Sequence, residues 1–170
     1  MPAGATYEPI ATTTLASPTT TITLSSIPAT YTDIRAIWVG NCATSGGALT
    51  VQLNGATTNY SVTNIHGNGT TAASNRRTTD SFMYIGYTQN LSTTANQVAM
   101  AIVDVFSYAG STNKTILGQM SNDKNGTGEV VRTVGLYRST SAITSITFGN
   151  DNTQNFSTGT TLTLYGIKAA

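Results

Sequence analysis

One histidine, His66, and one cysteine, Cys42, occur among the 170 residues, so the side chains most used in nucleophilic chemistry are scarce. A Ser–His–Asp triad would need His66, but a triad is defined by its geometry, and abundant serine does not indicate one. The sequence contains no Gly-x-Ser-x-Gly motif, and a zinc site of four Cys and His side chains lacks its ligands. We therefore expect His66 at a strand end or in an interface, and no intrachain disulfide at Cys42.

The carboxylates are the remaining candidates for acid–base chemistry, and there are seven of them: Glu8, Asp33, Asp80, Asp104, Asp123, Glu129 and Asp151. A glycosidase needs two carboxyl groups roughly 5 to 10 Å apart, and nothing in the spacing of these residues brings two together. Clefts that cleave or bind carbohydrate usually present aromatic platforms, whereas this chain has one tryptophan. The sequence therefore predicts a protein that is not an enzyme.

Two of the acidic positions have a structural interpretation. Asp104 interrupts the apolar run 102–106, and we expect it to pair with Arg35 or Arg132 at a strand crossing or a subunit contact. Residues 123–129 (DKNGTGE) are rich in oxygen ligands but lack the ligand positions of a calcium-binding loop. Their Asn-Gly pair predicts a hairpin turn. No metal ion or cofactor is expected.

Arg76 and Arg77 are the only adjacent pair of like charges in the sequence and a candidate partner contact. We expect them in a long polar loop at residues 67–80. One interpretation is a solvated loop tip. The other is a clamp on an acidic patch of a partner protein, because the guanidinium fork matches a carboxylate.

The composition excludes several classes of protein. Charged residues make up 9% of the chain and the net charge is +1, against about 25% charged residues in ordinary domains. This leaves no basic surface for nucleic acid and no polybasic anchor for a membrane. No apolar run reaches the ~18 residues of a membrane span, and the first residues do not have the pattern of a signal peptide. Folding without disulfides is compatible with a reducing cytoplasm.

Alternation of apolar and polar residues is the main structural signal, and β-branched threonine often takes the polar place. Residues 34–39 and 98–103 are nearly continuous apolar runs, which predict central strands covered on both faces, in a sandwich core or a subunit contact. A change of phase after Leu164 predicts a bulge in the last strand. Turn signals separate eleven predicted strands, near 7–15, 20–25, 34–40, 48–54, 59–65, 81–88, 97–108, 114–121, 129–138, 143–148 and 160–168. We expect an all-β domain over residues 7–170 with little or no helix, preceded by a flexible arm at residues 1–6.

Three groups of segments carry a resemblance to a known family. They are residues 7–11 (YEPIA) with 26–34 (SIPATYTDI), residues 52–55 (QLNG) with 59–61 (NYS), and residues 135–146 (GLYRSTSAITSI) with Phe156 and 164–167 (LYGI). In this order and spacing they resemble a β-sandwich module of tailed-bacteriophage virions, of the kind seen in marine and cyanobacterial phages. The resemblance implies a structural virion protein with a jelly-roll-like antiparallel sandwich.

Two functions are compatible with this resemblance. The first is a capsid decoration (cement) protein, made in the host cytoplasm, that binds the major capsid protein on the outer capsid surface as a homotrimer. The alternative is a tail, baseplate or fibre-associated module that binds host surface glycan through Tyr84, Tyr87, Tyr108 or Tyr137. The chain has no coiled-coil segment on which a fibre module would be mounted, so we expect decoration.

Overall fold

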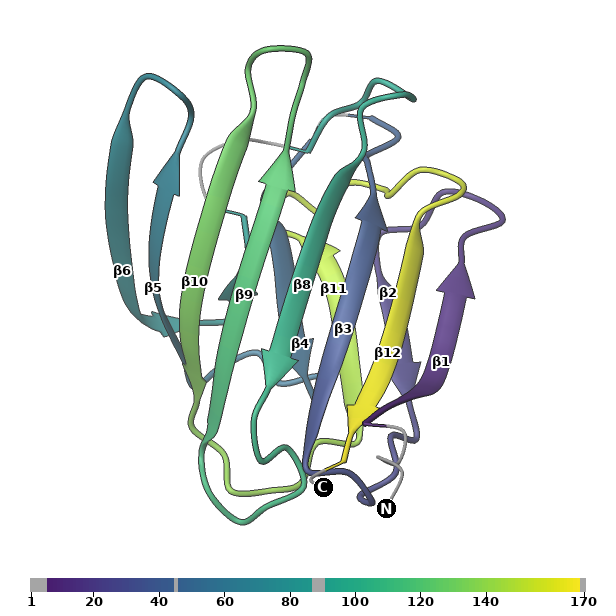
Figure 1. The fold of residues 1–170 in the computed structure, drawn as a ribbon, viewed down its shortest axis with the longest axis vertical. Coiled ribbons are helices and arrows are strands. Elements are labelled where there is room, and N and C mark those ends of the chain that lie inside the picture. Colours follow the sequence, from purple (N-terminus) through teal and green to yellow (C-terminus); the bar gives the residue numbers. More distant parts are fainter. Residues whose placement is uncertain (1–5, 45, 87–90, 169–170) are drawn as a thin grey trace.

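The computed structural model describes residues 6–44, 46–86 and 91–168, which form a jelly-roll-like antiparallel β-sandwich (Figure 1). These residues contain twelve strands in two sheets, one more than the eleven predicted, and no helix, so the expected all-β fold is confirmed. Within them, no helix is long and apolar enough to cross a membrane. Residues 1–5 of the predicted arm lie outside the described residues, while the carbonyl of Thr6 accepts a hydrogen bond from the backbone amide of Lys168 (3.0 Å).

The eight strands of the large sheet lie in the spatial order β1 (Tyr7–Thr14), β12 (Thr161–Ile167), β3 (Asp33–Gly40), β8 (Ala99–Val105), β9 (Lys114–Asn122), β10 (Glu129–Tyr137), β5 (Tyr60–Gly67) and β6 (Ala72–Asp80). The four strands of the small sheet lie in the order β2 (Ile22–Ser25), β11 (Ser145–Asn150), β4 (Leu49–Leu53) and β7 (Met83–Tyr84). In Figure 1 the small sheet lies behind the large one.

Eleven of these strands overlap the predicted ones, although β7 has only two residues of the predicted 81–88, and in most of them the residues alternate between the core and the outside. In β3, for example, every second residue from Ile34 to Gly40 is buried and the residues between them are half-buried. The expectation that residues 34–39 and 98–103 are covered on both faces is wrong within the chain. The small sheet covers one face only, and Met100 on the other face is exposed.

The core fills the space between the two sheets with large aliphatic and aromatic side chains. Trp38 packs on Phe156 with ring centroids 5.2 Å apart, and Tyr60 stacks on Tyr137 at 4.8 Å. Each fully buried side chain of this size stabilises the fold by roughly 1.5–3 kcal/mol. No disulfide is needed in a chain of this length with such a core.

The prediction of a bulge in the last strand, β12, is wrong. In β12 the alternation continues without interruption, and Gly166 takes the inward position that follows Leu162 and Leu164. A Cβ atom on Gly166 would overlap the ring of Tyr31, which packs against this backbone. The bulge lies in the neighbouring strand β1, where the register shifts between Pro9 and Ala11.

The free edges of both sheets are poor templates for pairing with another strand. The edge strand β1 carries Pro9 and its bulge, and the edge strand β6 carries Arg76 and Arg77. The edge strands of the small sheet, β2 and β7, have four and two residues. Proline, bulges, charge and short length all discourage edge-to-edge association, so contacts with other molecules are expected through a sheet face.

Candidate docking face

Exposed apolar side chains gather on the side of the large sheet that the small sheet leaves uncovered, which we call the outer face. Five of them point outward from β5, β8, β9 and β10, two flank β8, and one lies on β1. These eight large, exposed apolar residues of the described chain are Tyr7, Ile65, Val98, Met100, Phe106, Leu117, Val130 and Val134. Soluble monomers rarely gather exposed apolar side chains in this way, and such surfaces mark interaction sites.

The strand register brings these side chains into rows across the sheet. Ile65 on β5 lies opposite Arg132 on β10, which lies opposite Gln119 on β9. Two residues further along β10, Val134 lies opposite Thr63 and Leu117. Neighbouring rows of an antiparallel sheet therefore place apolar and polar side chains in alternation, and each exposed apolar group has a polar neighbour.

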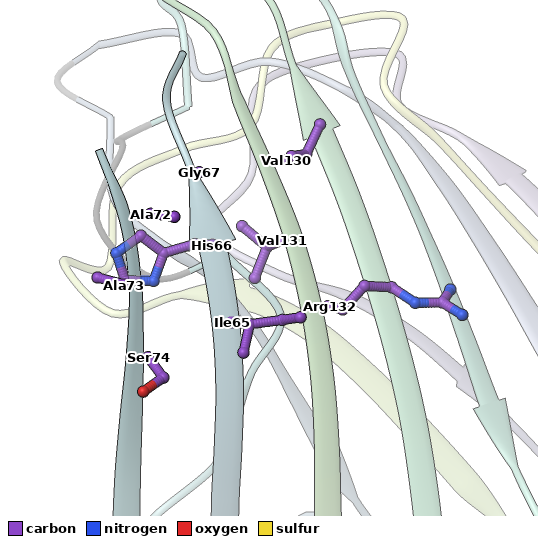
Figure 2. Close-up of a pocket in the computed structure, with 9 residues that line it drawn as sticks. All are labelled: Ile65, His66, Gly67, Ala72, Ala73, Ser74, Val130, Val131 and Arg132. Carbon is purple, nitrogen blue, oxygen red and sulfur yellow. The ribbon is translucent and has the colours of Figure 1, made fainter. Parts of the chain in front are cut away.

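Small side chains at one end of these rows leave a groove of about 560 Å³ over β6, β5 and β10. Gly67, Ala72 and Ser74 are too small to fill the space, and Ile65 and Val130 stand at its sides. Figure 2 shows Ile65 extending toward β10, whereas His66, the next residue on β5, points toward Ala73. Val130 is 64% exposed and Ile65 is 61% exposed, more than any other large apolar residue described.

A second groove of about 380 Å³ lies further along the same three strands. Arg76 on β6 and Arg138, just after β10, line it together with Val134 and Leu136. Its walls therefore combine guanidinium groups with aliphatic side chains, which is the combination found at protein interfaces rather than at small-molecule sites.

Three arginines of this region, Arg76, Arg132 and Arg138, have no carboxylate partner among the described residues. Arg76 Nε donates to Thr63 Oγ1 (3.4 Å), Arg132 donates to Gln119 Oε1, and Arg138 Nη2 donates to the carbonyl of Thr78 (3.3 Å). The ion pairs formed within the described chain join Arg35 to Asp104, Arg77 to Asp80 and Lys168 to Glu8. The outer face over β5, β6 and β10 is therefore positively charged.

The centre of the outer face holds a neutral ion pair. Arg35 Nε donates to Asp104 Oδ1 (2.6 Å) and Arg35 Nη2 donates to Asp104 Oδ2 (2.9 Å). Of the two partners expected for Asp104, Arg35 is therefore the correct one. The hydrogen bonds to Asp104 raise the pKa of Arg35, and its Nη1 also donates to the hydroxyl of Tyr7 (3.1 Å).

The predicted loop at residues 67–80 is wrong, because residues 72–80 form strand β6 and place Arg76 and Arg77 on opposite faces. Arg76 is exposed on the outer face. Arg77 lies on the inner face, with its guanidinium carbon 4.2 Å from the centre of the Tyr84 ring, and pairs with Asp80 Oδ1 (3.5 Å). The two arginines do not form one clamp, and contact of Arg76 with a partner protein stays a prediction.

The turn predicted at residues 125–126 is confirmed. Asn125 and Gly126 have positive φ angles of 61° and 98°, and Asp123 Oδ1 accepts the backbone N–H of Gly126 (3.0 Å). The turn joins β9 to β10. In the described part of the chain, no group of three His, Cys, Asp or Glu side chains is placed to hold a metal ion.

The tyrosines expected to bind glycan do not form an exposed platform. Tyr84, Tyr108 and Tyr137 are 7%, 0% and 6% exposed, and Tyr87 lies outside the described residues. The hydroxyl of Tyr108 donates to the carbonyl of Pro28, which ties two loops together. These three rings therefore belong to the core.

No family model matches the chain, and no curated protein matches it. Among solved structures, the galectin LEC-6 of Caenorhabditis elegans is similar over 93% of this chain and 96% of its own, with 10% sequence identity and a TM-score of 0.36. At this level of similarity no ligand or partner is carried over from that protein.

Proposed function

We propose that this chain is a structural virion protein of a tailed bacteriophage that decorates the outer capsid surface and stabilises the assembled shell of major capsid protein. The phage context comes from the resemblance of three groups of segments, and the mode of action comes from the outer face of the large sheet. The observation that carries the proposal is the gathering of exposed apolar side chains on that one face.

A decoration protein acts mechanically, and this fold is suited to that role. The strands of the large sheet are tied into one hydrogen-bonded sheet, so a load on one strand is shared by its neighbours. Contact across the junction of two shell subunits resists their separation. Because many copies bind one shell, modest individual contacts add up to strong attachment.

Decoration is also favoured over the glycan-binding alternative. The three described tyrosines assigned to that alternative are buried, and neither groove of the outer face is lined by a tyrosine, phenylalanine or tryptophan. The large exposed apolar side chains on the outer face over β5, β9 and β10 are aliphatic, namely Ile65, Leu117, Val130 and Val134. Aliphatic surfaces of this kind bind another apolar protein surface by excluding water.

Co-sedimentation with purified mature shells that lack this chain tests the proposal. We expect saturable binding of the wild type and a large loss on replacement of Val130 by Glu, which places a charge in the apolar contact. Thr14→Glu on β1 is the matched control, since it adds the same charge to an exposed position of the same face. Absence of shell binding by the wild type, or an equal effect of the two variants, would contradict the proposal.

The oligomeric state belongs to the same proposal. We expect a homotrimer, and sedimentation velocity of the free chain measures it directly. A monomer at micromolar concentration would contradict the trimer and leave the shell-binding experiment unaffected.

A further inference from the structure

We infer that the surface bound by this outer face is an acidic protein surface, whose carboxylates pair with Arg76, Arg132 and Arg138 around an apolar contact at Ile65, Val130 and Val134. This inference rests on the proposed function and names the chemistry of the partner. It follows from the charge of the face and from the way its cations alternate with apolar groups.

The three arginines border the grooves of the outer face. Arg132 lines the groove formed beside Ile65 and Val130, and Arg76 and Arg138 line the groove beside Val134. Figure 2 shows the side chain of Arg132 extending away from Ser74 and Ala73, across the sheet. Arg132 therefore stands beside exposed aliphatic side chains, and Arg76 and Arg138 share their groove with Val134 and Leu136.

Carboxylates are the groups best suited to accept the remaining hydrogen bonds of these arginines. Each guanidinium has hydrogen-bond donors beyond the one used on Thr63, Gln119 or Thr78. The Cα atoms of Arg76 and Arg132 are separated by two strand spacings and two residues, about 12 Å. Because Arg76 reaches Thr63 on β5 and Arg132 reaches Gln119 on β9, away from Arg76, we expect each arginine to pair with a carboxylate of its own. Contact of the apolar groups removes water from the neighbouring pairs and strengthens them.

A second copy of this chain does not fit the same surface. A symmetric contact through β5, β6 and β10 would bring the arginines of two copies together without an acid to separate them. The carboxylate of Asp104, on the same face, already has both oxygens bonded to Arg35. Like charges placed against each other in this way oppose association.

Nucleic acid is a poorer match than an acidic protein surface. The outward residues of β5, β6, β9 and β10 include no aromatic side chain, so bases would find no ring on which to stack. The large exposed aliphatic groups would gain little against a phosphate backbone. The net charge of the chain is +1, which gives little general attraction for a polyanion.

The test measures binding of the full chain to the purified mature shells at low and high salt. Arg76→Gln and Arg132→Gln each remove one positive charge, and Thr14→Glu lowers the net charge by the same amount on the far side of the face. We expect each Arg→Gln variant to weaken binding by about tenfold at low salt and to reduce its salt dependence, with Thr14→Glu close to the wild type. Thermal unfolding of all three variants should match the wild type, since the replaced side chains are exposed.

The outcomes separate the two proposals. If both Arg→Gln variants bind the shells as strongly as the wild type, the inference of an acidic partner surface is overturned, and the decoration role is unaffected. If the wild type does not bind shells, the decoration role fails, and titration of the labelled chain with poly-L-glutamate then decides the inference. Amide shifts on β5, β6 and β10 that are lost in the double variant Arg76→Gln/Arg132→Gln support it, whereas no shifts, or equal shifts with single-stranded DNA, overturn it.

Discussion

Arg35 and Asp104 lie directly opposite each other on β3 and β8 and join the two strands through two side-chain hydrogen bonds on the outer face. Both groups are partly buried, with side-chain exposures of 33% and 16%. The pair neutralises itself, and it leaves the positive charge of the face with the arginines of β6 and β10. The ion pair thus joins β3 and β8 at the centre of the face, while the part of the face over β5, β6 and β10 is available to a partner.

Replacement of Asp104 by Asn should lower the free energy of unfolding by about 1 kcal/mol, since the pair is bidentate but a third of Arg35 is in solvent. Urea unfolding measures the change. The double variant Arg35→Gln/Asp104→Asn should lower the free energy of unfolding by less than the sum of the two single variants. Additive effects would show that the pair does not stabilise the sheet.

Glu8→Gln is the matched control for this pair. Glu8 Oε1 accepts from Lys168 Nζ (2.6 Å), but the contact joins the two ends of the described chain, and the side chains of Lys168 and Glu8 are 48% and 34% exposed. The bond to Lys168 lowers the pKa of Glu8. Because water and salt screen this contact, we expect no measurable change in unfolding for Glu8→Gln at physiological ionic strength.

Gly166→Ala should destabilise the fold by about 1–3 kcal/mol, because the added methyl group overlaps the ring of Tyr31 and forces it to move. Gly149→Ala is the control, since its methyl group would meet Thr21 Cγ2 at an ordinary 3.4 Å. Thermal unfolding of the two variants measures the difference. Equal melting temperatures would show that Tyr31 does not require the glycine.

Tyr60 should make the fold sensitive to alkali. Its buried hydroxyl donates to the carbonyl of Leu53 (3.3 Å) and accepts the N–H of the same residue (2.7 Å), and burial raises its pKa. Above about pH 10 the unfolded chain loses this proton while the folded chain keeps it, so the free energy of unfolding falls as the pH rises.

Urea unfolding between neutral pH and pH 11 tests the role of Tyr60. Tyr60→Phe should be less stable at neutral pH by about 1–3 kcal/mol, because Leu53 loses its partner, but its stability should fall less steeply in alkali. Tyr165→Phe, on the outer face, is the control, since it removes a hydroxyl group without touching the contact of Tyr60 with Leu53. If the free energy of unfolding of Tyr60→Phe falls with pH as steeply as that of the wild type, the alkali sensitivity does not come from Tyr60.

Cys42 should be unreactive in the folded protein. Its side chain is fully buried, Asn150 Nδ2 lies 3.8 Å from the sulfur, and burial raises the pKa of the thiol. The thiolate is the reactive form, so a chromogenic thiol reagent should react at the rate of unfolding and rapidly only in denaturant. Rapid labelling of the native protein would show that the loop around Cys42 opens locally.

Most of the fold could be predicted from the sequence because alternating side chains identify a half-buried strand. Strand β6 was missed because its inward residues Ala73, Asn75 and Arg77 are small or polar and give no apolar period. Backbone pairing with β5 holds β6 in the sheet, and this pairing cannot be recognised from the local amino-acid composition. Because this strand is not predicted, Arg76 and Arg77 are expected in a loop, whereas they lie on opposite faces of a strand.

The docking face was only partly predictable. Adjacent apolar residues within one strand, such as Val130 next to Val131 and Ile116 next to Leu117, place apolar groups on both faces of a sheet. At residues 98–103 the same signal predicts a strand covered on both faces, in a sandwich core or a subunit contact. In β9 and β10 the signal is limited to single pairs of apolar residues within alternating strands. Which arginines share the exposed face depends on strand order, and strand order requires the structure.

Gold labelling of intact virions with an antibody against this chain, viewed by electron microscopy, tests the central claim most directly. The account predicts label spread evenly over the head, and the same antibody should leave shells without this chain unlabelled. Label confined to the tail, or absent from the particle, would contradict the decoration role.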